Sequence, residues 1–277
     1  MKFLVAGATG TVGRNIVEQL VQSGHQVRAL TRNPAKANFP DGVEIVAGDL
    51  TNPTTLASAL EGVTGLHLIT FGGDNYAPLQ TGKEIVALAE KAGVQRVTVL
   101  MSRAKGAVEE ALESSSLTWT FLQPVEFMSN IIQWAPSISA AGEIKLPFAD
   151  RKTVIVHEAD IAAVAVAALT EDGHAGKTYP ITGAEVLTPR DMVRIIGSII
   201  GTDIRLIEMT EAEAREQWQA EGHPQQVIDF LVWVYGNTPP IGYTVVPTVE
   251  QVTGRPARTF AQWAAEHADA FRAAVKV

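Results

Sequence analysis

KFLVAGATGTVGRNIV, residues 2–17, is the stretch of the sequence that decides the fold. A short apolar run at residues 3–5 leads directly into three glycines at intervals of three residues, Gly7, Gly10 and Gly13. Apolar side chains then recur at helical spacing. The stretch therefore predicts a buried strand, a tight turn and a helix, in that order.

The first half of the chain repeats this order. Its strand-like runs carry apolar residues without alternation, which is typical of strands that helices cover on both faces. We therefore expect an α/β fold, with a doubly wound parallel sheet and right-handed crossovers. The expected strands are residues 3–5, 27–30, 43–46, 66–71, 97–101 and 119–122, and the expected helices are 12–21, 54–60, 79–92 and 104–113.

The regular alternation of expected strands and helices ends after Pro124. Residues 161–169 are apolar nearly all round, so this expected helix should be buried. We divide the chain into a nucleotide-binding domain at 1–125 and a region at 126–277 that packs on it, some segments of which return to the first domain. The other expected helices are 127–134, 189–200, 211–222, 227–235 and 260–275, and the expected strands are 153–156, 179–182 and 204–208.

Composition excludes several classes of protein. The chain has no cysteine, which rules out disulfides, thiolate metal sites and a cysteine nucleophile. Its formal net charge of −8 at pH 7, without Lys/Arg clusters, disfavours nucleic acid and anionic membranes as partners. The six histidines form no H-x-x-x-H pair, so we expect no metal site. The N-terminal apolar run, residues 3–6, is too short for a signal peptide, and the longest apolar run, residues 161–169, is too short for a membrane span, so we expect a soluble, cytoplasmic protein.

The glycine turn is the first candidate binding site. Gly7 permits the tight turn, Gly10 lets backbone N–H groups approach a pyrophosphate, and Gly13 lets the helix lie close to the strand. The helix N-terminus adds a partial positive charge. The alternative is a glycine-rich turn without a ligand. The context of strand, turn and helix favours a dinucleotide.

The residues after the second expected strand indicate which dinucleotide binds. NAD enzymes usually carry Asp or Glu there, to bind the ribose hydroxyls. This chain has Thr31 and Arg32, followed by Lys36. An arginine binds a 2′-phosphate in bidentate fashion, whereas a carboxylate repels it. We therefore expect NADP(H) in preference to NAD(H), the alternative being that Arg32 is only a solvated surface residue.

Several segments together resemble the NmrA-like atypical short-chain dehydrogenases/reductases, and their order and spacing cover most of the chain. The family includes NAD(P)H quinone oxidoreductases and triarylmethane reductases, and also redox-sensing regulators that bind NADP without turnover. The resemblance implies a Rossmann domain with a smaller α/β C-terminal part that closes over the nicotinamide. The segments are GATGTVGRNIVEQL, VRALTRNPAKA, GDLTNPTTLASAL, TWTFLQPVEFMSN and ADIAAVAVAAL.

The resemblance also implies site residues. Cofactor contacts would come from the ends of five expected strands, and substrate contacts from the segment after Pro124. Core packing is the alternative for Phe127, Met128 and Trp134. The implied cofactor contacts are Gly7, Thr9, Gly10, Thr11, Val12 and Gly13 at the diphosphate, Arg32 at the 2′-phosphate, Asp49 and Leu50 at the adenine, Thr70, Phe71 and Gly72 along the ribose and diphosphate, and Pro124 and Val125 at the nicotinamide; the implied substrate contacts are Phe127, Met128, Asn130 and Trp134. Asp160 is expected only to cap the helix that it begins.

The sequence departs from the larger superfamily at its proton donor, Tyr-x-x-x-Lys. None of the four tyrosines, Tyr76, Tyr179, Tyr235 and Tyr243, is followed by lysine four residues later. Two other residues are catalytic candidates. Lys105 either reaches the nicotinamide ribose or forms a surface i,i+4 pair with Glu109, and Ser102 could contact the substrate. Gln123 replaces an arginine that is frequent in the family before the proline.

The missing tyrosine limits the chemistry that we expect. A simple ketone becomes an alkoxide on reduction and needs an acid or an oxyanion stabiliser. A quinone, an iminium ion or a triarylmethyl cation accepts hydride without forming a strongly basic anion, so positioning alone can suffice. The sequence thus predicts an NADPH-dependent reductase of small, electron-poor aromatic molecules. Two alternatives remain: an NADP(H) sensor read by a protein partner, and a biosynthetic enzyme that performs oxygenation or isomerisation.

Overall fold

The computed structural model describes residues 1–73, 77–102 and 104–272. Tyr76, one of the four tyrosines considered above, and the end of the helix expected at 260–275 lie outside the described residues. The chain forms two compact units. Unit 1 comprises Met1–Pro124, Glu158–Ile181 and Thr248–Arg255, and unit 2 comprises Val125–His157, Thr182–Pro247 and a segment that begins at Pro256.

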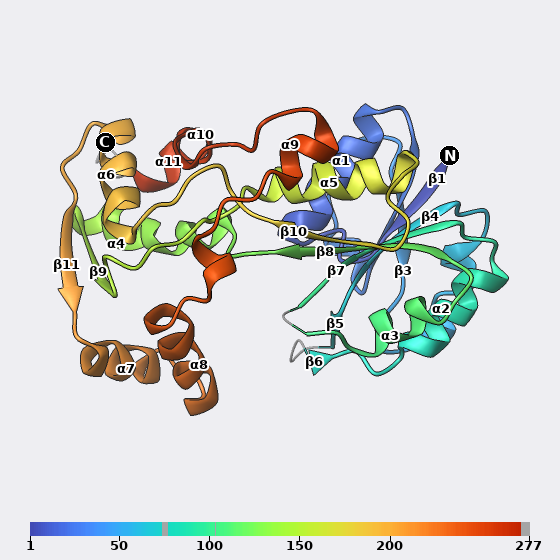
Figure 1. Ribbon diagram of the computed structural model, residues 1–277, viewed down its shortest axis with the longest axis horizontal. Coiled ribbons are helices and arrows are strands. Elements are labelled where there is room, and N and C mark those ends of the chain that lie inside the picture. The colour runs from blue at the N-terminus through green and yellow to red at the C-terminus, as the bar shows by residue number, and fades with distance from the viewer. Residues whose placement is uncertain (74–76, 103, 273–277) are drawn as a thin grey trace. The chain divides into compact units, whose positions relative to one another are not determined.

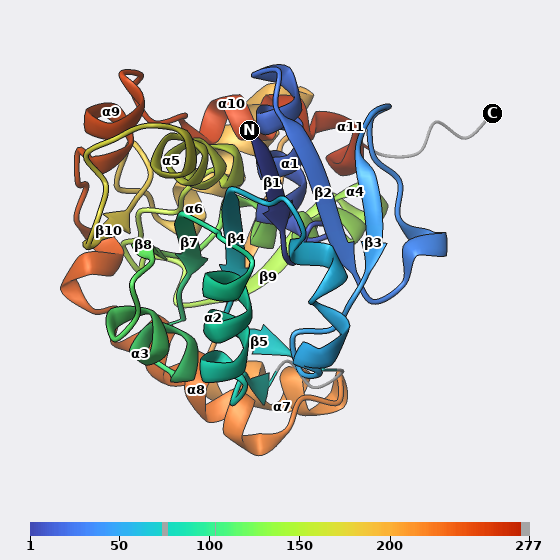
Figure 2. The ribbon, with the colours of Figure 1, turned by 90° about the vertical axis from the view of Figure 1, so that its right-hand side faces the viewer.

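Unit 1 is built on a seven-stranded sheet in the order β10-β8-β7-β4-β1-β2-β3, and every neighbouring pair is parallel (Figure 2). The order reverses between β1 and β4, which makes the sheet doubly wound. The expected α/β fold is therefore confirmed. The strands are β1 (Lys2–Val5), β2 (Gln26–Thr31), β3 (Glu44–Ala47), β4 (Gly65–Ile69), β7 (Arg96–Leu100), β8 (Thr118–Pro124) and β10 (Lys177–Ile181).

Helices cover both faces of this sheet. On one face α1 (Thr11–Gln22) packs against α5 (Glu158–Thr170), and α9 (Thr248–Thr253) packs against α5 (Figure 1). The other face carries α2 (Gly82–Lys91) and α3 (Ala107–Glu113). In α5 all residues except Val166 and Thr170 are buried, as the apolar run at residues 161–169 predicts.

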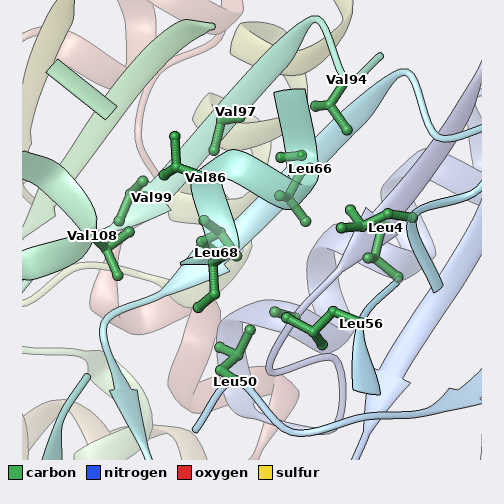
Figure 3. Packing of buried hydrophobic residues seen from close by; sticks show 14 of the residues in the cluster. Leu4, Leu50, Leu56, Leu66, Leu68, Val86, Val94, Val97, Val99 and Val108 are labelled. Atoms are coloured by element: carbon green, nitrogen blue, oxygen red, sulfur yellow. The ribbon is translucent and has the colours of Figure 1, made fainter. Parts of the chain in front are cut away.

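The main core of unit 1 lies between the sheet and the side of α2 and α3. Leu66, Leu68, Val97 and Val99 project from β4 and β7 toward Val86 and Val108 of the two helices (Figure 3). These strand residues alternate with others on the opposite face, so both faces of the central strands are buried. This two-sided burial explains why the strands are mostly apolar in the sequence, although the buried His67 and Thr98 interrupt the two runs.

Unit 2 contains the remaining elements. Two strands, β9 (Glu143–Pro147) and β11 (Arg205–Met209), form a parallel pair. A core around Trp263 and Phe260 joins the helices of this unit. The helices are η4 (Met128–Trp134), α4 (Ala135–Ala141), α6 (Pro189–Ile200), α7 (Glu211–Ala220), α8 (Gln225–Gly236), η5 (Pro240–Tyr243), α10 (Phe260–Glu266) and α11 (Ala268–Phe271).

Four expected elements were wrong in type or extent. The helix at 54–60 is two 3-10 turns, η2 (Pro53–Thr55) and η3 (Ser58–Leu60), and residues 127–134 are also 3-10. Residues 153–156 form only isolated bridges, and the last helix breaks at His267. These segments are short or lack a side-chain cap at their start, so local packing decides their conformation.

Two smaller corrections concern strand and helix ends. The strand expected at 66–71 ends at Ile69, and β5 (Phe71–Gly72) then pairs with β6 (Ala77–Pro78) in antiparallel fashion. Helix α5 begins at Glu158, so Asp160 lies inside its first turn and is not the capping residue expected from the sequence. Among the described residues, no helix combines the length and apolar character that crossing a bilayer requires.

Candidate cofactor and acceptor site

The glycine turn connects β1 to α1. Gly7 has φ of +64°, a left-handed conformation that glycine adopts without strain, and its carbonyl oxygen accepts a hydrogen bond from the Gly10 N–H at 2.9 Å. A Cβ added to Gly13 would lie 2.1 Å from that same Gly7 oxygen. Any larger residue at Gly13 would therefore push α1 away from the turn.

The N-terminus of α1 is suited to an anion. Gly10 is the N-cap and provides no side chain to bond the first N–H groups, and the first turn of the helix carries no acidic residue. Thr9, Gly10 and Thr11 are exposed, whereas Val12 is buried beneath them. Free N–H groups and the helix dipole both favour a phosphate at this position.

Cationic side chains lie around the end of β2. Arg32 directly follows the strand and is exposed. Arg14, in the first turn of α1, donates from Nη1 to the Asn38 carbonyl oxygen at 3.1 Å, and its guanidinium lies 5.6 Å from the centroid of the Phe39 ring. This contact ties the loop that follows Arg32 to the start of α1. Residues 31–40 contain no carboxylate to repel a 2′-phosphate.

The loop after β3 is held by its own side chains. Asp49 accepts hydrogen bonds at Oδ1 from the Thr51 N–H and hydroxyl, both at 2.8 Å. The hydroxyl of Thr81 donates to the Leu50 carbonyl oxygen at 2.6 Å, and the Leu50 side chain belongs to the core. Asp49 is thus held at the carboxyl edge of the sheet, while Leu50 can offer a ligand only its backbone.

The segment after β4 contains a buried hydroxyl without a partner. Thr70 is 6% exposed, and its Oγ1 has no hydrogen-bond partner among the described residues. Two residues on, a Cβ at Gly72 would lie 2.6 Å from Leu79 and 2.7 Å from Thr51. The side chains of Leu79 and Thr51 thus fill the space beside Gly72, whereas the orphaned Thr70 hydroxyl suits a polar ligand at this edge. Together with the glycine turn, these residues fit a dinucleotide.

Lys105 and Ser102 lie after β7. The Lys105 ammonium pairs with Glu113, and the side chain is half exposed. Glu109 is fully buried and accepts at Oε2 from the Gly106 N–H at 3.0 Å. The alternative interpretation of Lys105, a surface i,i+4 pair with Glu109, is therefore wrong, because Glu109 is buried and caps the start of its own helix. The Ser102 hydroxyl donates to the Ala104 carbonyl oxygen at 3.0 Å.

The four residues expected on the substrate side lie in unit 2, and their surroundings differ. Met128 and Trp134 are buried in the core of this unit, with 1% and 7% exposure. Phe127 is half-buried, and Asn130 is exposed. Only Phe127 and Asn130 thus have side chains that a small molecule could reach without a rearrangement of the core.

Unit 2 also holds a polar cluster that sequence reasoning missed. Arg151 donates from Nη2 to both carboxylate oxygens of Glu126, at 2.9 and 3.2 Å, and its guanidinium lies 4.3 Å from the centroid of the Tyr235 ring. Burial raises the pKa of Tyr235, and the charge of Glu126 raises it further. The three residues come from separate segments of the chain. The only feature of the sequence that could have pointed to this cluster is the position of Glu126 between Val125 and Phe127, two residues that were predicted to contact the reactants.

Comparisons with known proteins agree with this architecture. Residues 7–102 match a family described as NAD(P)H-binding, and residues 97–232 match the NmrA-like family. A relative from Streptomyces griseus subsp. griseus, (4-alkanoyl-5-oxo-2,5-dihydrofuran-3-yl)methyl phosphate reductase, is 36% identical over 97% of this chain and 98% of its own. The NAD(P)H azoreductase of Xenophilus azovorans is 34% identical over 98% of this chain and 99% of its own. Among solved structures, the NADPH-dependent quinone oxidoreductase QOR2 of Escherichia coli, complexed with NADPH, has a TM-score of 0.79 at 25% identity, covering 96% of this chain and 99% of that one.

The doubly wound sheet and the glycine turn define a Rossmann-type dinucleotide-binding protein. Its similarity to named reductases over nearly the full length of the chain narrows this class to the reductases. The chain belongs to the NmrA-like family and is an NAD(P)H-dependent oxidoreductase. The family resemblance and the expectation of an enzyme are both confirmed.

Proposed function

We propose that this enzyme transfers hydride from NADPH to a small, electron-poor acceptor, either a quinone-like molecule or a cationic aromatic one. One observation carries the proposal: a cofactor site with free N–H groups and an orphaned Thr70 hydroxyl occurs in a chain without Tyr-x-x-x-Lys. The bound nicotinamide would supply the hydride. The chain would bind and orient the two reactants and exclude water from them.

The relatives' names support this class of acceptor. Their acceptors are named or implied as an azo group, a quinone and a dihydrofuranone. The dihydrofuranone in the first name has a ring C=C bond conjugated with two carbonyl groups. Hydride addition to a quinone or to this conjugated dihydrofuranone places the electron pair on a carbonyl oxygen, so the resulting anion is only moderately basic. Such acceptors need less acid catalysis than a simple ketone.

The residues proposed for the cofactor and the acceptor follow from the family. We assign the cofactor to residues of 1–125, with the glycine turn at the diphosphate, Asp49 and Leu50 at the adenine, Thr70, Phe71 and Gly72 along the ribose, and Pro124 with Val125 at the nicotinamide. We assign the acceptor to residues of 126–277, with Phe127 and Asn130 in direct contact and Met128 and Trp134 supporting them from the core. The proposed setting is the cytoplasm, without a nucleic-acid or membrane partner.

The proposed preference for NADPH rests on Arg32. A charge-assisted contact with a 2′-phosphate contributes about 1.5–3 kcal/mol, or roughly 10- to 150-fold in affinity. Arg32→Met should therefore raise the Kd for NADPH by that factor and leave the Kd for NADH within about twofold. Fluorescence titration of each cofactor measures both values. Arg194→Met, which removes an exposed arginine of unit 2, is the matched control. An equal loss for both cofactors would contradict the assignment.

The proposed activity is tested by NADPH consumption at 340 nm with a panel of quinones, simple ketones and triarylmethyl dyes. Cofactor binding should accompany turnover of quinones or dyes in preference to ketones. Faster turnover of ketones would contradict the proposal. Binding without any turnover would instead identify an NADP(H) sensor, and product formation without matching NADPH loss would identify an isomerase or oxygenase.

A further inference from the structure

Tyr235 occupies the inward face of α8. Ile228 and Val232, at helical spacing on the same face, are buried, whereas Phe230 and Trp233 on the other face are exposed. The Tyr235 ring lies under the Arg151 guanidinium. Within the described part of the chain, the Tyr235 hydroxyl makes no hydrogen bond. The residue is half-buried and its hydroxyl is not among the unpartnered atoms that are closed off from solvent, so this group is available to a ligand.

The ring is held in place through Arg151. The Arg151 and Glu126 side chains are only 12% and 20% exposed, and the hydrogen bonds described above join Arg151 Nη2 to both carboxylate oxygens. The Thr153 hydroxyl, which is buried, lies 3.5 Å from the same Glu126 carboxylate. A charge-assisted contact in such a shielded position restricts both side chains. The guanidinium plane in turn restricts the ring of Tyr235.

Glu126 connects this cluster to the residues assigned to the reactants. The Val156 N–H donates to the Glu126 carbonyl oxygen, and the Met128 N–H donates to the Val156 carbonyl oxygen, both at 2.9 Å. This short parallel bridge holds residues 126–128 in an extended form directly after Val125. Glu126 thus stands in sequence between Val125, assigned to the nicotinamide, and Phe127, assigned to the acceptor.

Backbone strain lies beside the same tyrosine. Phe148 has φ of +53°, which makes it the one non-glycine residue with positive φ among the described residues. Its ring lies 3.4 Å from the position that a Cβ on Gly236 would take, and Gly236 directly follows Tyr235. Strained residues cluster at ligand and active sites, where the surrounding structure maintains them. This observation is independent of the hydrogen bonds of the cluster.

We propose that Tyr235 is a catalytic residue that donates a hydrogen bond, and then its proton, to the acceptor oxygen, in place of the missing Tyr-x-x-x-Lys tyrosine. The inference rests on the proposed function. When a quinone accepts hydride from NADPH, an electron pair moves onto a carbonyl oxygen. The Tyr235 O–H protonates that oxygen, and solvent returns a proton to the phenolate. The sum is NADPH, a proton and a quinone giving NADP⁺ and a hydroquinone.

The charges around Tyr235 suit both halves of this step. Burial and the Glu126 carboxylate raise the pKa of Tyr235, so the phenol is protonated when the acceptor binds. The Arg151 cation acts in the opposite direction and stabilises the phenolate after the proton has left. An isolated tyrosine without the cation would be a poorer donor.

The test compares two acceptors in one variant. Tyr235→Phe keeps the ring over Arg151 and removes only the hydroxyl. We expect kcat for a benzoquinone to fall by about 100-fold, in the range of general acid catalysis. A triarylmethyl cation becomes neutral when its central carbon accepts hydride, so no oxygen needs a proton. With that dye, kcat should stay within about twofold of the wild type.

Three controls accompany the variant. Tyr243→Phe, at a 40% exposed tyrosine, should leave both rates unchanged. The Kd for NADPH and the Tm of Tyr235→Phe should equal those of the wild type. Across a series of substituted benzoquinones, the loss in Tyr235→Phe should grow with the pKa of the hydroquinone formed, because a more basic oxygen depends more on an acid.

Each remaining outcome is decisive. An equal fall with quinone and dye would show that the hydroxyl only supports the structure, and unchanged quinone turnover would show that it is not used. Either result overturns the inference while the proposed function stands. Wild-type protein that reduces the dye but no quinone also overturns it. Wild-type protein that binds NADPH and reduces neither acceptor refutes the proposed function itself.

Discussion

His67 in β4 shows how a single residue responds to complete burial. Its ring is fully buried, and Nδ1 lies 2.9 Å from the Thr98 hydroxyl of the neighbouring strand β7. Burial lowers the pKa of His67 from 6.5 to about 3, because the charged imidazolium cannot be solvated there. The residue is therefore neutral in the folded protein, while the unfolded chain takes up a proton below the ordinary pKa.

This difference predicts a pH dependence of stability. The unfolded state binds more protons than the folded state between pH 6.5 and about 3, so the free energy of unfolding falls as the pH falls through that window. The contribution is about 1.4 kcal/mol per pH unit. His67→Gln should remove it, and denaturant titrations from pH 7 to pH 4 would show a shallower slope.

The exposed His223 provides the control for this measurement. His223→Gln should keep the wild-type slope, because its ring remains in contact with solvent. A His67→Gln variant with the wild-type slope would show that the carboxylates alone cause the acid sensitivity.

At the scale of elements, the contact between the glycine turn and α1 limits what the chain tolerates. Helix α1 approaches the turn so closely that only a hydrogen atom fits at Gly13. The same approach places the first N–H groups of the helix at the candidate phosphate position. Packing and cofactor binding therefore depend on one geometry.

Gly13→Ala should disturb both properties. A methyl group 2.1 Å from the Gly7 oxygen forces the helix to shift, which should lower the free energy of unfolding by about 3 kcal/mol and abolish measurable NADPH binding. Gly106→Ala is the control, since its Cβ would meet only the Glu109 Oε2, at 3.6 Å. Denaturant unfolding and fluorescence titration measure the two effects. Tight NADPH binding by Gly13→Ala would refute the role given to the turn.

At the scale of the whole molecule, the chain passes between its two units five times. Unit 1 takes α5, β10 and α9 from beyond residue 125, and 11 of the 13 residues of α5 are buried. A fragment of residues 1–125 would leave the face of α1 that contacts α5 exposed to water. Loss of an element buried to this extent removes a large part of the apolar stabilisation.

We therefore expect the fragment 1–125 to unfold without a cooperative transition and to bind ANS. A fragment of residues 1–181 restores α5 and β10 and should recover part of the NADPH binding. Circular dichroism melts, ANS fluorescence and NADPH titration compare the two with the full chain. Cooperative unfolding and NADPH binding by 1–125 would show that α5 contributes little to unit 1.

The sequence by itself determined the elements that local signals specify. Helix α6 runs over Pro189–Ile200 as expected, because Thr188 and Asp191 form a capping box, Pro189 stands at the first position and Gly201 ends the helix in the left-handed conformation. The glycine turn was readable for the same reason, since the residues that shape it are neighbours in the chain. The apolar runs of β4 and β7 likewise predicted a buried parallel sheet.

Only the tertiary structure decided which distant segments meet. Residues 177–181 join the main sheet beside β8, while β9, which the sequence did not predict, pairs with β11. The partner of Lys105 proved to be Glu113, and Arg151 joined Glu126 to Tyr235. Helix caps, turns and the spacing of apolar residues depend on residues that are neighbours in the sequence. The choice of strand partners and the formation of side-chain clusters depend on the packing of the whole chain.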